Sequence, residues 1–182
     1  MLAVSFAHDE QMYEVHLPQI ADYAPNTFAM CAEMCLALGM SPQQIVQNAA
    51  RITQTPHRMQ VTNCGFYVVD DGYNASLSGV ESSCKTLSKF GGKKCAVAQG
   101  IVEGGRQSRQ LNARCGKMLG ETFDEVVVVG PNRHALEEGL LATNTLVLHA
   151  NSLAEATEIV RKNLSHGDIL YYQNDIPDLP VT

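Results

Sequence analysis

The sequence lacks the features that mark membrane, secreted and nucleic-acid-binding proteins. No hydrophobic run reaches the ~20 residues that cross a bilayer. The amino terminus carries His8-Asp9-Glu10 where a signal peptide has a basic and then an apolar segment. Basic residues are not in excess, because 13 Lys and Arg stand against 19 Asp and Glu, a net charge of −6. Since binding to a phosphate backbone needs a basic face, we expect a cytoplasmic protein with neither a membrane nor a nucleic acid as partner.

Motifs for metal binding and nucleophilic catalysis are also missing. The six histidines show no H-x-x-x-H spacing, and the six cysteines show no C-x-x-C spacing. Only Cys31 and Cys35 lie close together, four residues apart in an apolar segment, which predicts that they share one helix face. Free cysteine behaves as a small hydrophobic residue, so we expect six buried, reduced thiols. With no serine elbow and no Cys/His pair, the sequence predicts neither a metal site nor a catalytic residue.

A P-loop for phosphate binding is absent as well. The nearest match, 91–94, lacks both the leading glycine spacing and the Ser or Thr that would hold magnesium, so ATP cannot be anchored by that route. The loop 99–105 carries three glycines and Glu103, and a helix starting near Gln107 would offer its positive end to an anion. Because this loop has no G-x-G-x-x-G pattern, it fits a flexible substrate loop better than a phosphate cradle.

What is present indicates one domain and part of another. A chain of 182 residues can bury a core without disulfide or metal staples. Within residues 1–20, apolar and polar residues alternate at period two over 4–6 and 13–17, which predicts a hairpin. A two-stranded hairpin is marginal in water, so it must pack on something else. Two helices are predicted next, over 25–39 and from Ser41, which would cap a helix whose first residue is proline.

After Pro56 the pattern changes to apolar strands that alternate with helices. The predicted strands are 59–62, 66–69, 95–98, 126–129, 146–148 and 169–172, and the predicted helices are 77–90, 106–121, 132–142 and 152–164. Short, continuous apolar strands between such helices argue for a mainly parallel sheet covered on both faces. Right-handed crossovers then give an α/β, Rossmann-like, doubly wound domain.

Ligands of such a sheet bind beyond the carboxyl ends of its strands, and the segments found there are polar and rich in glycine. They are 70–74, 99–105, 130–133 and 173–178. Asp70 and Asp71 lie on opposite sides of an extended backbone, so they are unsuited to sharing a proton as a catalytic dyad. One could hydrogen-bond a ribose or orient a cation while the other caps the helix near Ser76, or both could be caps in a turn. Tyr73 and Asn74 offer a stacking surface and an amide to a nucleotide base or a peptide.

Arg58 precedes the first of these strands. Its guanidinium is always charged and offers forked donors, which suit a phosphate or a carboxylate. A surface ion pair is the alternative interpretation of this position.

The segment Asp70-Asp71-Gly72-Tyr73-Asn74-Ala75-Ser76 resembles the DDSYNANP signature that opens the C-terminal domain of the Mur ligase family. The likeness is greatest to the MurF subfamily, which joins D-alanyl-D-alanine to UDP-N-acetylmuramoyl-tripeptide, and to MurF-like proteins. Further segments agree in order: 56–59 resembles PGRM, 99–105 resembles GDMxELG, 123–130 resembles D-x-V-x-x-V-G, 173–178 resembles the ENDLPD of a MurF-like subgroup, and 25–39 resembles the HN…ALAA…LG segment of the central ATPase domain.

This resemblance implies an ATP-dependent amide ligase of peptidoglycan precursor synthesis. In that family a nucleotide-linked carboxylate is phosphorylated and an incoming amine attacks the acyl phosphate. The C-terminal domain closes over the central domain and brings contacts to both ATP and the amine. Carried over by motif, the ATP-binding residues would be Asn26, Arg58, Asp70, Asp71, Tyr73 and Asn74, and the residues near the amine substrate would be Glu103, Asn112, Asn174 and Asp175.

The resemblance also divides the chain. Residues 1–55 would be the C-terminal remnant of the central ATPase domain, and 56–182 would be the Mur ligase C-terminal domain. The N-terminal and central domains, in the same chain or a separate one, would then be partners that hold most of the ATP and Mg²⁺. The other partners implied are a UDP-muramyl peptide and an amino acid or dipeptide. We expect the chain alone to be inactive, because the P-loop is absent.

Three positions depart from the family pattern. His57 replaces a glycine, Asn112 stands where MurF has a histidine, and Ala29 replaces the second asparagine of HNxxN, an adenine contact in relatives. These departures keep open a second hypothesis, a non-catalytic Mur-like scaffold or regulatory module. A nucleotide-binding domain with no link to the cell wall is a third.

Overall fold

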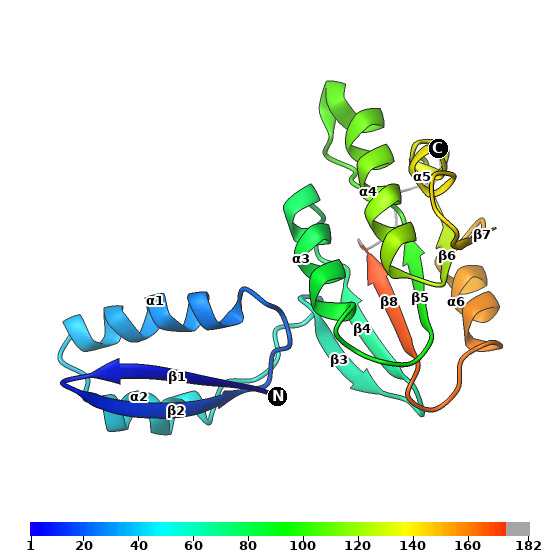
Figure 1. The fold of residues 1–182 in the computed structure, drawn as a ribbon. Helices are drawn as coiled ribbons and strands as arrows, with labels where there is room; N and C mark the ends of the chain where they lie inside the picture. The colour runs from blue at the N-terminus through cyan, green and yellow to red at the C-terminus, as the bar shows by residue number, and fades with distance from the viewer. Residues whose placement is uncertain (174–182) are drawn as a thin grey trace. The chain divides into compact units, whose positions relative to one another are not determined.

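The computed structural model describes residues 1–173 and divides the chain into two compact units, Met1–Thr55 and Pro56–Thr182 (Figure 1). Each unit has its own hydrophobic core. Among the described residues, no helix is long and apolar enough to cross a membrane.

The first unit is the predicted hairpin followed by two helices. Strand β1 (Leu2–His8) pairs antiparallel with β2 (Gln11–Leu17), and α1 (Ala24–Ala37) and α2 (Pro42–Ala49) follow. The core of this unit consists of Val4, Val15, Leu17, Phe28, Ala32, Ile45 and Ala49. Because these side chains come from both strands and both helices, the hairpin is stabilised by packing rather than by its own pairing.

Ser41 begins α2 as the sequence predicts. Its hydroxyl accepts a hydrogen bond from the Gln44 backbone N–H at 3.3 Å, and the Gln44 side chain accepts one from the Ser41 N–H at 2.8 Å. This reciprocal capping box, with Pro42 in the first turn, fixes where the helix starts.

The second unit is one six-stranded sheet with helices on both faces. Its elements are β3 (Gln60–Asn63), β4 (Tyr67–Asp71), α3 (Leu77–Leu87), β5 (Lys94–Ala98), a 3-10 turn (Gly105–Gln107), α4 (Ser108–Thr122), β6 (Glu125–Val128), α5 (Arg133–Leu140), β7 (Leu146–His149), α6 (Leu153–Arg161) and β8 (Ile169–Gln173). The strand order is β3-β4-β8-β5-β6-β7, and only β3 runs antiparallel to its neighbour. The predicted α/β, doubly wound, mainly parallel fold is confirmed.

The two faces of this sheet are covered by different helices. On one face, strand residues at alternate positions pack with α6 in a cluster that includes Val97, Val127, Leu170, Ala156 and Val160. On the other side α4 packs on both α3 and α5, and Figure 1 shows α3 and α4 along one side of the sheet and α6 along the other. Continuous burial of β5 and β6 follows from this double cover.

The prediction of six buried thiols is wrong for half of them. Cys84, Cys95 and Cys115 are buried, whereas Cys31 and Cys64 are exposed and Cys35 is half-buried. The exposed pair lies on the outer face of α1 and in the turn between β3 and β4. All six are free, as predicted. Burial raises the pKa of Cys84 to about 11 and the pKa of Cys95 and of Cys115 to about 12, so the buried thiols stay protonated and unreactive.

Two glycines let α4 and α5 approach backbone to backbone. A Cβ atom added at Gly116 would collide with the carbonyl oxygen of Leu136, and one added at Gly139 would collide with the carbonyl oxygen of Ala113. These obstacles are backbone atoms, which cannot rotate away as a side chain can. The close approach therefore depends on the missing side chains.

We expect Gly139→Ala to lower the free energy of unfolding by about 2–3 kcal/mol, because the added methyl group forces two helices apart. The matched control is Gly91→Ala, since Gly91 is exposed and a Cβ there meets nothing within 4 Å. Urea denaturation followed by circular dichroism measures both. Equal midpoints for the two variants would contradict the close packing.

Candidate functional site

The carboxyl ends of the parallel strands meet at one edge of the sheet in the second unit. The register pairs Gln173 at the end of β8 with Asp71 on β4 and with Ala98 on β5. Gln99 therefore follows directly beside Gln173, and Val128 ends β6 next to β5. Segments that are far apart in the sequence are brought to this edge as predicted, and we describe it from β4 toward β6.

Asp70 and Asp71 hold the turn that precedes β3. The Oδ2 atom of Asp70 lies 2.8 Å from Nδ1 of His57, and its Oδ1 accepts from the Gly72 N–H at 3.0 Å. The Oδ1 atom of Asp71 accepts from the Met59 N–H at 3.2 Å. The expectation that one aspartate caps the next helix is wrong, because the Ser76 hydroxyl performs that role.

The second oxygen of Asp71 is bound from inside the domain. The Ser83 hydroxyl on α3 donates to Asp71 Oδ2 at 2.8 Å, and the Tyr171 hydroxyl on β8 donates to the same atom at 3.1 Å. Burial, together with the nearby Asp71 carboxylate, raises the pKa of Tyr171 well above its usual range, so this hydroxyl remains a donor. Its ring stacks on Phe123 at a centroid distance of 5.3 Å. Asp71 thus links β4 to α3 and β8.

Arg58 and Tyr73 form an exposed pair beside the two aspartates. The guanidinium carbon of Arg58 lies 4.2 Å from the centroid of the Tyr73 ring, a cation–π geometry. Within residues 1–173 no carboxylate forms an ion pair with Arg58, so the surface ion pair considered as an alternative is not formed there. Tyr73 is 67% exposed, and Asn74 beside it is exposed too. The pair presents a positive charge on an aromatic surface to solvent.

Three side-chain amides shape the loop after β5. Asn112 accepts from the Ile101 N–H at 2.7 Å and donates to the Ile101 carbonyl at 3.0 Å. Gln173 accepts from the Gly100 N–H at 2.8 Å and donates to the Gly100 carbonyl at 3.2 Å. Asn132 also donates to the Ile101 carbonyl, at 3.2 Å. Because Asn112 is fully buried and bound to this backbone, an influence on a substrate would pass through the loop.

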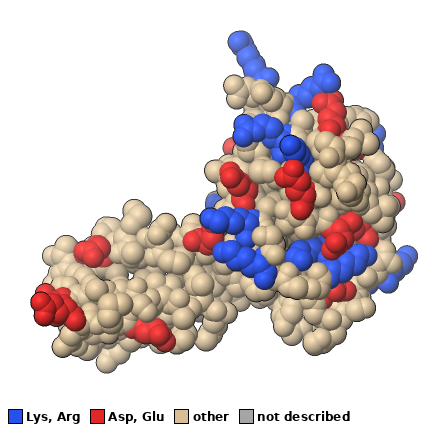
Figure 2. Space-filling model, in the orientation of Figure 1, with Lys and Arg blue, Asp and Glu red and all other residues tan. Residues whose placement is uncertain are grey.

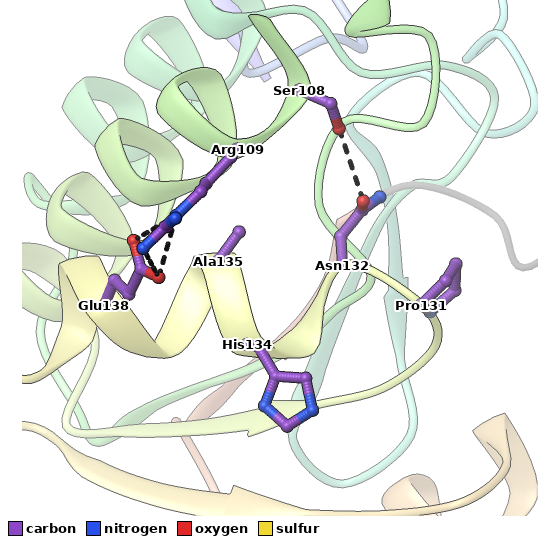
Figure 3. Close-up of a pocket in the computed structure, with 7 residues that line it drawn as sticks. All are labelled: Ser108, Arg109, Pro131, Asn132, His134, Ala135 and Glu138. Atoms are coloured by element: carbon purple, nitrogen blue, oxygen red, sulfur yellow. Dashed lines mark hydrogen bonds and ion pairs between the residues drawn. The ribbon is translucent and has the colours of Figure 1, made fainter. Parts of the chain in front are cut away.

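A depression of about 450 Å³ lies next to this loop. It is lined by Ser108, Arg109, Pro131, Asn132, His134, Ala135 and Glu138 (Figure 3). The first residues of α4 and α5 are both at this depression, and neither helix has a side-chain cap at its N-terminus. The positive end of each helix dipole favours an anion there. Arg109 lies along one wall, where its Nη2 is 2.8 Å from Glu138 Oε1.

Gln99 is a buried polar side chain without a partner among residues 1–173. It is 1% exposed, and neither its Oε1 nor its Nε2 atom makes a hydrogen bond within that part of the chain. Gly130 packs against it, since a Cβ there would lie 3.1 Å from Gln99 Cγ. An unpaired buried amide costs stability, and its position at the strand edge marks Gln99 as a candidate ligand contact.

The remaining predicted residues are spread more widely. Asn26 is exposed in the first turn of α1, in the first unit, and Glu103 is exposed in the loop after β5. Asn174 and Asp175 lie outside the described residues. Their roles stay predictions.

Sequence reasoning missed His57, Gln99, Asn132 and Gln173 as individual site residues. Position at the carboxyl end of a buried apolar strand marks the segments that begin with Gln99 and Gln173, but nothing in the sequence distinguishes these two residues within them.

The comparisons with known proteins give one family. Residues 57–172 match the family model described as Mur ligase, glutamate ligase domain. The fold resembles MurF ligase from Thermotoga maritima in complex with ADP, with 22% identity, a TM-score of 0.80, and coverage of 94% of this chain and 39% of that one. A MurF structure from Acinetobacter baumannii gives 22% identity, a TM-score of 0.82 and the same coverages.

A second kind of ligase shares the fold. Folylpolyglutamate synthase from Mycobacterium tuberculosis, complexed with ADP and AMPPCP, is 18% identical with a TM-score of 0.66, over 90% of this chain and 40% of that one. The 182-residue chain thus spans about two fifths of the length of these structures.

We expect Gln99→Met to raise the free energy of unfolding by about 1 kcal/mol, because it removes an unpaired buried amide at similar volume. Gln173→Met is the matched control and should lower that free energy by about 2 kcal/mol, since it removes two buried hydrogen bonds to the Gly100 backbone. Urea unfolding of both variants decides the point. A loss of stability in Gln99→Met as large as in the control would show that the Gln99 amide is paired.

Proposed function

Because this chain belongs to the Mur ligase family, we propose that it is the C-terminal part of an ATP-dependent amide ligase, the part that encloses ATP and receives the amine. The observation that carries this proposal is the arrangement of the strand edge, where an exposed arginine on an aromatic ring and an anion-favouring depression belong to one domain. The likeness to MurF structures supports a muramyl-peptide ligase that adds D-alanyl-D-alanine or a similar amine to a UDP-muramyl peptide.

The residues present fit one side of an ATP site. Arg58 would contact the phosphates, and Tyr73 and Asn74 would line the cleft for the base or ribose. Complexes of the similar ligases with ADP support this assignment. No P-loop occurs in the 182 residues, so the central domain would supply most contacts to ATP and Mg²⁺. The chain alone should therefore bind nucleotide weakly and form no product.

The depression between α4 and α5 suits the carboxylate of the amine substrate. A D-alanyl dipeptide carries one carboxylate, and the positive dipole ends of two helices without side-chain caps meet at this depression. Glu103 on the neighbouring loop would face the positively charged amine. The loop that carries Glu103 is fixed at Ile101 by Asn112, which connects the buried amide to the substrate.

The first unit fits the end of a second domain. The outer face of α1 exposes Met30, Met34 and Leu38 by 65% or more, although its inner face is buried too. Large apolar side chains on the outer face of a helix whose inner face is already buried are typical of a helix covered by further protein. Arg51 is the only Lys or Arg in residues 1–55, and Figure 2 shows little charge on the visible surface of this unit. We infer that residues 1–55 belong to the central ATPase domain, whose remaining part covers α1.

A non-catalytic scaffold is the second candidate function. Ala29 on the exposed side of α1 favours it, since the resemblance places an adenine-contacting asparagine there. The two functions differ in one readout. If this chain encloses ATP, replacing Arg58 weakens the use of ATP by the assembled ligase, whereas replacing Arg58 in a scaffold leaves the kinetics of the ligase unchanged.

We expect Arg58→Ala to raise the KM for ATP about 10- to 100-fold, because one charge-assisted contact to phosphate is worth roughly 1.5–3 kcal/mol. The assay measures ATP-dependent joining of D-alanyl-D-alanine to UDP-N-acetylmuramoyl-tripeptide by the assembled ligase that contains this chain. Arg114→Ala, at an exposed position on α4, is the matched control and should leave KM unchanged. Unchanged kinetics in Arg58→Ala would favour the scaffold.

A larger side chain in the depression should affect the binding of the amine substrate and not the binding of ATP. Ala135→Leu should raise the KM for D-alanyl-D-alanine about tenfold or more while leaving the KM for ATP within about twofold, because Ala135 lines the depression and lies on α5. Ala154→Leu, the same exchange at an exposed position on α6, should change neither. Equal changes in the KM for D-alanyl-D-alanine and the KM for ATP would show that the amine substrate does not bind in this depression.

A further inference from the structure

The turn before β3 is strained on both sides of Arg58. His57 has a φ of 58° and Met59 a φ of 48°, values in the left-handed region that glycine favours and other residues rarely adopt. Histidine is enriched in this region together with Asn and Asp, whereas Met59 is not one of the residue types that tolerate it. Such conformations persist only where surrounding contacts hold them, and they gather at functional sites. The residue held between the two strained positions is Arg58.

Each strained residue is held by one aspartate. Asp70 Oδ2 accepts from Nδ1 of the His57 ring at 2.8 Å, and Asp71 Oδ1 accepts from the Met59 backbone N–H at 3.2 Å. Because neighbouring residues on a strand project to opposite sides, the two adjacent aspartates can bind the turn at two different residues, His57 and Met59. The Tyr73 N–H adds a bond to the His57 carbonyl at 3.2 Å.

Both carboxylates are also fixed to the frame of the domain. Asp70 takes the Gly72 N–H with its second oxygen, and Asp71 takes the hydroxyls of Ser83 and Tyr171. A carboxylate bound in this way is poorly placed to contact a ligand directly. It is well placed to transmit the rigidity of the sheet to the turn.

We propose that Asp70 and Asp71 are positioning residues, a two-sided clamp that acts through His57 and Met59 to hold Arg58 against the Tyr73 ring. Arg58 is then the group that meets the anionic ligand, and the aspartates set its orientation. The evidence for the clamp is the set of contacts within the unliganded protein. Only the identity of the anion, a nucleotide phosphate, rests on the proposed function.

The clamp is tested first in the unliganded chain by NMR. At 4.2 Å from the Tyr73 ring centroid, the protons of the Arg58 side chain should carry a ring-current shift, which Tyr73→Leu abolishes and so calibrates. Asp70→Ala should remove more than half of that shift. In a His57→Gly background Asp70→Ala should remove little more, because the ring through which it acts is gone. Glu158→Ala, exposed on α6, is the control and should change nothing.

An unchanged Arg58 shift in Asp70→Ala overturns the clamp. Circular dichroism of each variant shows that the fold is retained. Should Asp71→Asn unfold the chain through its buried contacts, the Asp70 variants still decide the question, because Asp70 is partly exposed and lies outside that buried set.

The second arm uses ADP as the probe and calorimetry as the readout. Arg58→Ala and Asp70→Ala should each weaken ADP binding about tenfold, and the double variant should be no weaker than Arg58→Ala alone. A further loss in the double variant would mean that Asp70 contacts the ligand directly and would overturn the positioning role. If Arg58→Ala leaves ADP binding unchanged, the nucleotide assignment fails, and the NMR arm alone decides the clamp.

Discussion

The pairing of β8 between β4 and β5 is the constraint on which the rest of the second unit depends. This strand comes last among the described elements, yet its backbone completes the centre of the sheet. It carries Tyr171, whose hydroxyl binds Asp71, and Gln173, whose amide binds Gly100. One strand therefore positions both halves of the site, the turn at Arg58 and the loop after β5. A register shift of one residue would move both groups to the wrong face of the sheet.

The two halves of the site use polar groups differently. Near Arg58, carboxylates fix a positive group that is left exposed for a ligand, and each of their contacts is to protein. Around the loop after β5, neutral amides hold the backbone instead, and the N-terminal ends of α4 and α5 contribute positive potential beside Arg109. The buried side of the loop therefore carries no charged side chain among these contacts, and no charge has to be desolvated there. This division suits one exposed contact for a highly charged phosphate and one sheltered contact for a small carboxylate.

Periodicity and end signals predicted most of the elements, because each is fixed by its own residues. The start of α2 follows from Ser41 and the proline after it, and β5 and β6 follow from their own apolar runs. The position of β8 could not be predicted in this way, since an apolar strand fits any interior place in a parallel sheet. Arg58 and the aspartates were found by motif, but their division of roles was not. It depends on which carboxylate oxygen meets which donor, and that is decided by three-dimensional packing of Ser83 and Tyr171.

The histidine at position 57 shows how a departure from a family pattern can be compensated. Glycine would adopt a φ of 58° without cost, whereas a residue with a Cβ pays roughly 1–2 kcal/mol. The imidazole regains part of this stability through Asp70, because a solvent-exposed pair of this kind contributes up to about 1 kcal/mol. The exchange makes the turn depend on a side-chain contact instead of on backbone freedom. Since glycine also loses more conformational entropy on folding, a histidine at this position lowers that cost while the Asp70 contact anchors the turn that carries Arg58.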